Sequence, residues 1–177
     1  SGGGVLTREQ FLPHEMRIVA GLRTQGVSDE QVIVRVKSEN LFQYPTERMV
    51  ANRATVCLRR LDAMVPTDAA CAARGIDPKT AVEALSLTGL MASGTPTQAD
   101  QSIFYSMICR YDIVREFVLV EVGERLQNFD YAFTAADLNA FMTRFTTEYP
   151  DAARWTEATV KRIKGSIRQT LRHAGLI

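Results

Sequence analysis

Apolar residues return at intervals of three or four along most of the chain, and this spacing predicts amphipathic helices. Three stripes show it most clearly: Leu12, Met16, Val19 and Leu22; Val50, Ala54, Cys57, Leu61 and Met64; and Val160, Ile163, Ile167 and Leu171. Residues 32–36 are rich in β-branched side chains and would also suit a strand. Because Ser28 and Gln31 precede them in a capping-box pattern, we expect a helix there too.

Glycine, proline and capping residues mark where these helices begin and end. Pro66 is expected to end one helix, Asp77 with Pro78 to begin another, and Gly175 to close the last. The predicted helices cover residues 12–24, 28–39, 46–66, 68–74, 77–92, 97–110, 112–127, 134–149 and 156–173. The fold class predicted from this pattern is all-α, a multi-helix bundle.

The predicted helix at 112–127 is strongly hydrophobic, and we expect it to be the buried centre of its region. The loop at 127–130 then indicates a boundary between an N-terminal helical bundle at 5–127 and a C-terminal part at 128–177. The C-terminal part holds two short helices joined by a tight loop, and the second helix is basic. Such a pair is typical of a helix-turn-helix.

The composition is that of a globular protein, with 46% apolar and 23% charged residues. A membrane span needs about 20 mostly apolar residues, and the sequence has no such stretch. The three cysteines, Cys57, Cys71 and Cys109, are odd in number and lie within helical patterns. Without a leader-like opening segment, these features favour a cytoplasmic location. Residues 1–4 are interpreted as a processing scar or flexible tail.

The net charge of +1 is spread unevenly. Residues 151–177 hold six bases and two acids (+4), whereas the rest of the chain holds 15 bases and 18 acids (−3). Clustered positive charge attracts phosphate even when the total is near zero. The distribution therefore favours a polyanionic partner for the C-terminal region.

The last predicted helix separates this charge from its apolar stripe. Its bases recur beside the stripe and are expected to contact phosphates, with Thr159 at the groove. These bases are Lys161, Arg162, Lys164, Arg168 and Arg172. The alternative is a solvated face whose cations favour a helix C-terminus.

A second group of bases lies on the predicted helix at 46–66: Arg48, Arg53, Arg59 and Arg60. Arg53 and Arg60 are seven positions apart and so share a face. That face could contact nucleic acid or a protein partner, or could be a plain solvent face.

Residues typical of catalysis are scarce. His14 and His173 are the only histidines, and neither lies in a recognisable nucleophile turn. The cysteines lack metal-ligand spacing, and no phosphate-binding glycine loop is present apart from the tail. The sequence therefore predicts no catalytic residue, metal site or cofactor, and a binding protein rather than an enzyme.

Short segments in both halves of the chain match the motifs of a known family. They are EMRIVA at 15–20, GVS at 26–28, ENLFQ at 39–43, RRL at 59–61, YDIVREF at 111–117, WTEATVKR at 155–162 and LRHAGLI at 171–177. With these segments the chain resembles the BrxA family of bacterial BREX phage-defence systems over nearly its whole length. The resemblance implies a helical N-terminal part similar to the antitermination factor NusB, a C-terminal winged-helix-like part, and DNA binding. One departure is that the chain ends at Ile177, where a wing hairpin would be expected to begin.

The leading hypothesis is a non-catalytic accessory protein that binds double-stranded DNA beside other BREX proteins. RNA binding is an alternative, because a NusB-like body would permit it. A third hypothesis is a protein adaptor that assembles defence components, with its charged face serving an acidic partner.

Overall fold

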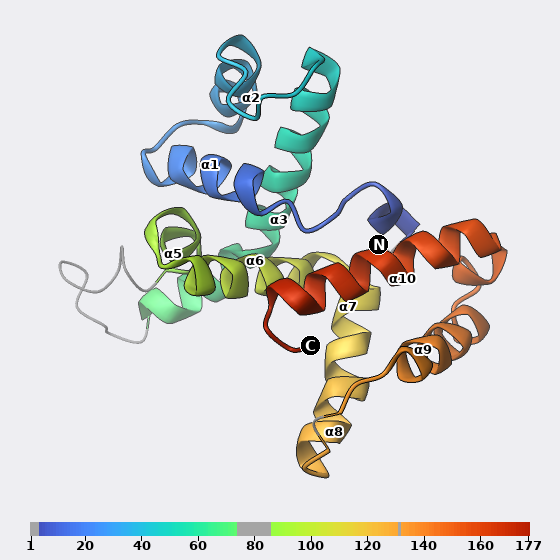
Figure 1. Ribbon diagram of the computed structural model, residues 1–177. Coiled ribbons are helices and arrows are strands. Elements are labelled where there is room, and N and C mark those ends of the chain that lie inside the picture. Colours follow the sequence, from blue (N-terminus) through green and yellow to red (C-terminus); the bar gives the residue numbers. More distant parts are fainter. Residues whose placement is uncertain (1–3, 74–85, 131) are drawn as a thin grey trace. The chain divides into compact units, whose positions relative to one another are not determined.

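The computed structural model describes residues 4–73, 86–130 and 132–177, and there it consists of helices joined by short connections (Figure 1). The α-helices are α1 Pro13–Thr24, α2 Asp29–Ser38, α3 Glu47–Ala73, α5 Leu87–Ser93, α6 Pro96–Arg110, α7 Asp112–Glu116, α8 Gly123–Gln127, α9 Ala135–Glu148 and α10 Glu157–His173. Short 3₁₀ turns lie at η1 Gly4–Thr7 and η3 Ala152–Arg154, and a π-helical segment, η2 Phe117–Val122, joins α7 to α8. The described residues contain no strand. The all-α fold is confirmed, whereas the winged-helix interpretation stays a prediction.

Local capping signals place several helix starts correctly. The Ser28 hydroxyl accepts a hydrogen bond from the Gln31 amide at 3.3 Å and begins α2, so residues 32–36 are helical. At the start of α9, the Thr134 hydroxyl accepts from the Asp137 amide while the Asp137 carboxylate accepts from the Thr134 amide. Both bonds satisfy amides that would otherwise lack a partner at a helix N-terminus.

Pro66 does not end its helix, contrary to the sequence-based prediction. α3 continues through Pro66 to Ala73, so the separate helix expected at 68–74 is part of it. Pro66 is exposed, and the next turn is held by a hydrogen bond between the Thr67 and Tyr105 hydroxyls, 3.0 Å apart. The helix expected at 77–92 lies mostly outside the described residues. Its described end, α5, starts afresh after Ser86, whose hydroxyl caps it.

Two compact units make up the chain. The first, Leu12–Ser106, holds α1, α2, α3, α5 and most of α6. Within it α1 packs against α3 and α5, and α2 packs against α3. Fully buried side chains from these helices form the core of this unit: Met16, Val19, Val32, Val36, Ala54, Cys57, Met64, Met91 and Ile103.

The second unit joins the segment up to Phe11 to Met107–Ile177. The Tyr111 hydroxyl donates to Glu9 Oε2 at 2.5 Å, and the Tyr149 hydroxyl donates to Glu116 Oε1 at 2.7 Å. These bonds link the region just after α6 to the N-terminal segment and to the end of α9. The units therefore do not divide near residue 128, where the sequence indicated a boundary.

The region 112–127 is buried only in its first half. Ile113, Val114 and Phe117 are buried, but Leu119 is 67% and Leu126 57% exposed. A π-helical turn holds more residues than an α-helical turn, so side chains after Phe117 are rotated away from the rows that a 3.6-residue period predicts. The expectation that this helix is the buried centre of its region is wrong beyond Phe117.

Candidate nucleic-acid interface

α10 has one buried face and one charged face, as its sequence predicts. Ile163, Ile167 and Leu171 are at most 3% exposed, and the Thr170 hydroxyl lies 3.8 Å from the Met107 sulfur. Four cations lie on the exposed side, and we call them the cationic face: Lys161, Arg162, Arg168 and Arg172. From Lys161 to Arg172 the helix rises about 16 Å at 1.5 Å per residue.

Two hydrogen bonds hold α10 within its unit. The Ser166 hydroxyl donates to the Leu6 carbonyl oxygen at 2.8 Å and ties the helix to η1. The Lys164 ammonium donates to Asn139 Oδ1 at 3.0 Å and ties it to α9. Lys164 is half-buried, so it is a link between helices as well as a base beside the cationic face.

The cationic face lacks internal neutralisation. None of its four side chains forms an ion pair with an acid of the described residues. Paired bases lie elsewhere in the chain: Arg23, Arg35, Lys37, Arg115, Arg125 and Arg144. Since the face's charges are exposed and unpaired, they are available to an anionic partner.

Thr159 lies in the cap of α10. Its amide donates to the Thr156 hydroxyl at 3.2 Å, and the two hydroxyls are 3.0 Å apart. Thr159 is half-buried, and its contact with a nucleic-acid groove stays a prediction.

The connection between α9 and α10 is longer than a helix-turn-helix requires. It runs from Tyr149 to Thr156 and includes η3, whereas the motif usually has a turn of about three or four residues. The tight loop expected here is therefore a structured connection.

The second group of bases does not form one surface. Arg48 and Arg59 are exposed, Arg53 is half-buried, and Arg60 is 0% exposed. Arg53 and Arg60 do share a face, but it is not a solvent face. The sequence left open a second basic surface here, either for a partner or for solvent, and Arg60 belongs to neither because it is buried.

Arg60 belongs to a polar cluster with Glu15, Tyr44, Arg53 and Cys57. The Tyr44 hydroxyl donates to Glu15 Oε1. Burial is the larger cause, and this bond the next, of a raised Tyr44 pKa. Burial also raises the pKa of the Cys57 thiol to about 12; Glu15 adds to the shift, while Arg60 and Arg53 oppose it. The acid Glu15 and the two bases therefore all lie close enough to Cys57 to affect its thiol. A buried arginine needs an acid nearby to offset its charge, and Glu15 is the acid of this cluster.

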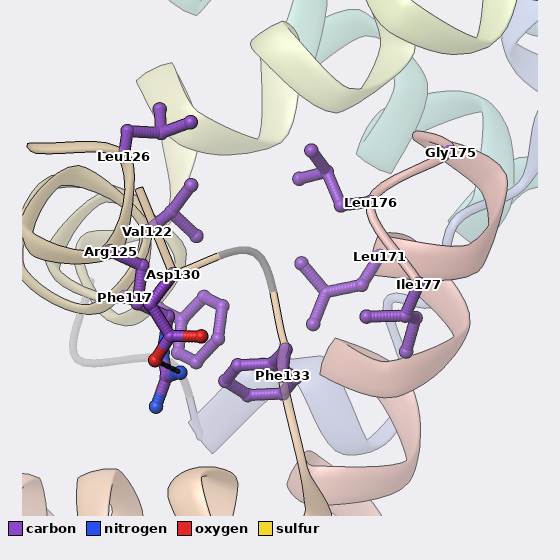
Figure 2. A pocket seen from close by; sticks show the side chains of 10 residues that line it. All are labelled: Phe117, Val122, Arg125, Leu126, Asp130, Phe133, Leu171, Gly175, Leu176 and Ile177. Carbon is purple, nitrogen blue, oxygen red and sulfur yellow. Dashed lines mark hydrogen bonds and ion pairs between the residues drawn. The ribbon is translucent and has the colours of Figure 1, made fainter. Parts of the chain in front are cut away.

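An apolar pocket of about 270 Å³ lies in the second unit (Figure 2). Phe117, Phe133 and Leu171 are among its lining side chains. Arg125 at its edge is already paired, at 3.1 Å from Asp130 and 2.7 Å from Asp137. The pocket is slightly smaller than the roughly 300–1,000 Å³ typical of ligand sites, and its charged groups are occupied with one another. It offers little to orient a polar substrate.

The described residues bring together no three His, Cys, Asp or Glu side chains in a metal-binding group. His173 stacks on Phe11, with ring centroids 4.4 Å apart, and so packs at the end of α10. No helix in the described part of the chain has both the length and the apolar character to cross a membrane.

The sequence model of the BrxA family matches residues 4–177. No curated protein and no solved structure matches the chain. The family match covers helices of both units, including α3 with its polar cluster and α10 with its cationic face.

Proposed function

The chain belongs to the BrxA family, which associates it with BREX phage defence, and we propose that it binds double-stranded DNA through α10 without catalysing a reaction. The observation that carries the proposal is the cationic face: four exposed cations, without an ion pair to any described residue, on a helix whose opposite side is anchored in its unit. Such a helix presents charge without having to rearrange its own core.

The dimensions of α10 fit a DNA groove. An α-helix with its side chains is about 10–12 Å wide, and the major groove of B-DNA is about 12 Å wide. The cations along the exposed side could then reach phosphates on the groove walls. The major groove of duplex RNA is deep and narrow, so the same helix would fit it poorly.

Fluorescence anisotropy of labelled duplex DNA and matched duplex RNA tests the proposal. Four phosphate contacts predict a slope of about −3.6 for log affinity against log salt, so a fourfold rise in salt weakens DNA binding roughly 150-fold. Replacing Arg168 and Arg172 by Gln is expected to lower the magnitude of the slope by about 1.8.

A matched control comes from α3. Arg48→Gln with Arg59→Gln removes the same charge from two exposed arginines that form no ion pair within the described part of the chain, and should leave DNA affinity and salt slope nearly unchanged. Equal losses in both double variants would show that binding follows net charge rather than α10. Tighter binding of RNA than of DNA would favour the RNA alternative. If the native chain binds neither at low salt, the adaptor alternative moves ahead.

A further inference from the structure

Gly165 lies in the middle of α10 on its exposed side, between the bases of the cationic face. A Cβ added there would meet no atom within 4 Å. At other positions the fold itself requires glycine: a Cβ at Gly94 would lie 2.4 Å from the Leu90 carbonyl oxygen, and Gly175 has a φ of 74°. Glycine disfavours a helix more than any other residue except proline. Neither packing within the described chain nor backbone conformation explains Gly165.

A polar hollow of about 480 Å³ opens over Gly165. Its lining combines η1 and its flank with α10: Thr7, Gln10, Arg162, Gly165, Ser166 and Gln169. The Ser166 to Leu6 hydrogen bond fixes η1 beside α10, and Leu6 is fully buried. The walls of the hollow are therefore held in place by the core of the unit.

The hollow has donors suited to an anion. Arg162 and Gln169 are seven positions apart and so lie on the same side of α10. Both are exposed, and neither has a hydrogen-bond partner among the described residues. Its volume far exceeds the roughly 10–15 Å³ of cavity volume that one water molecule needs, which leaves room for a larger polar group.

We propose that this hollow receives the sugar–phosphate backbone of one DNA strand, with the missing side chain at Gly165 allowing close approach and Arg162 and Gln169 donating to phosphate oxygens. The inference rests on the proposed function of α10 and names the part of the duplex that the hollow holds. Backbone contacts of this kind fix the register of a protein on the duplex without reading its sequence.

Gly165→Ala and Gly165→Gln test the inference, with Gly21→Ala and Gly21→Gln as matched controls. Gly21 lies in α1, and a Cβ there would also meet no atom within 4 Å. Both alanine variants should raise the urea midpoint of unfolding, because alanine is the better helix former. Only the Gly165 variants should lose duplex affinity, and Gly165→Gln should lose roughly tenfold, the equivalent of one charge-assisted hydrogen bond.

The same titrations separate the two proposals. If the native chain binds and Arg168→Gln with Arg172→Gln weakens it, but Gly165→Gln binds as tightly as the native chain, the hollow is not the phosphate site and α10 remains the interface. Equal weakening by Gly21→Gln would also overturn the inference, because the effect would not be local. A native chain that fails to bind duplex DNA at low salt overturns both.

Discussion

Replacing the buried Arg60 by Met should destabilise the protein severely. Arg60 is 0% exposed, and Glu15, which acts on the same Cys57 thiol, is 8% exposed. Methionine fills much of the arginine volume but removes the buried cation of the polar cluster, which leaves the half-buried Arg53 as the cluster's remaining base. Removing one member of a buried charge group costs about 3–5 kcal/mol. Since domains are stable by only about 5–15 kcal/mol, about a fifth or more of the free energy of unfolding would be lost.

Urea denaturation at pH 7, followed by far-ultraviolet circular dichroism, measures this loss. The control is Arg59→Met at the neighbouring, exposed position, where a change within about 0.5 kcal/mol is expected. Adding Glu15→Gln to Arg60→Met should recover about 1–3 kcal/mol, because the acid that Arg60 helped to offset is then neutral. If Arg60→Met and Arg59→Met lose equally little stability, Arg60 is not part of a buried charge cluster.

Two further predictions concern helix capping and pH. Thr134→Ala should lower the free energy of unfolding by about 1 kcal/mol, because the hydroxyl that accepts from the Asp137 amide is lost, whereas Thr143→Ala, at an exposed position inside α9, should cost less in the same urea titration. The raised pKa of Cys57 means that the folded state holds its proton more tightly than the unfolded state. This contribution is fully present below the ordinary value of 9.0 and is lost as the pH rises toward about 12. Urea titrations from pH 7 to 11 should therefore show a falling free energy of unfolding, and the fall with pH should be shallower in Cys57→Ala. If the free energy of unfolding falls equally steeply with pH in both proteins, the thiol is not buried as described.

The features that the sequence predicts correctly are local ones. The apolar stripe of α10 repeats within one helix, and the caps at Ser28, Thr134 and Thr156 each bond a backbone amide three residues ahead. The physical cause of each of these features lies in a few residues that are close in the sequence. They were sufficient to predict the all-α fold and the division of α10 into two faces.

The features that were missed depend on contacts between distant segments. Arg60 is buried in a cluster that includes Glu15 from another helix, whereas a charge run alone favours a solvent face. The second unit depends on the bond from Tyr111 to Glu9, across 102 positions, and on the bond from Ser166 to Leu6, across 160. No pattern within either segment indicates these pairings, so the boundary near residue 128 followed the loop rather than the packing.

On the exposed side of α10, several residues lower the intrinsic stability of the helix. Arg168 and Arg172 are like charges four positions apart, which costs about 0.2–0.5 kcal/mol in a helix. Gly165 lies on the same exposed side and costs up to about 1 kcal/mol relative to alanine. On the buried side of the same helix, the apolar side chains pack in the core, and the hydroxyls of Ser166 and Thr170 each donate a hydrogen bond. Departures from local rules that nothing in the described chain compensates are expected at functional sites, and here they coincide on the face that we propose contacts DNA.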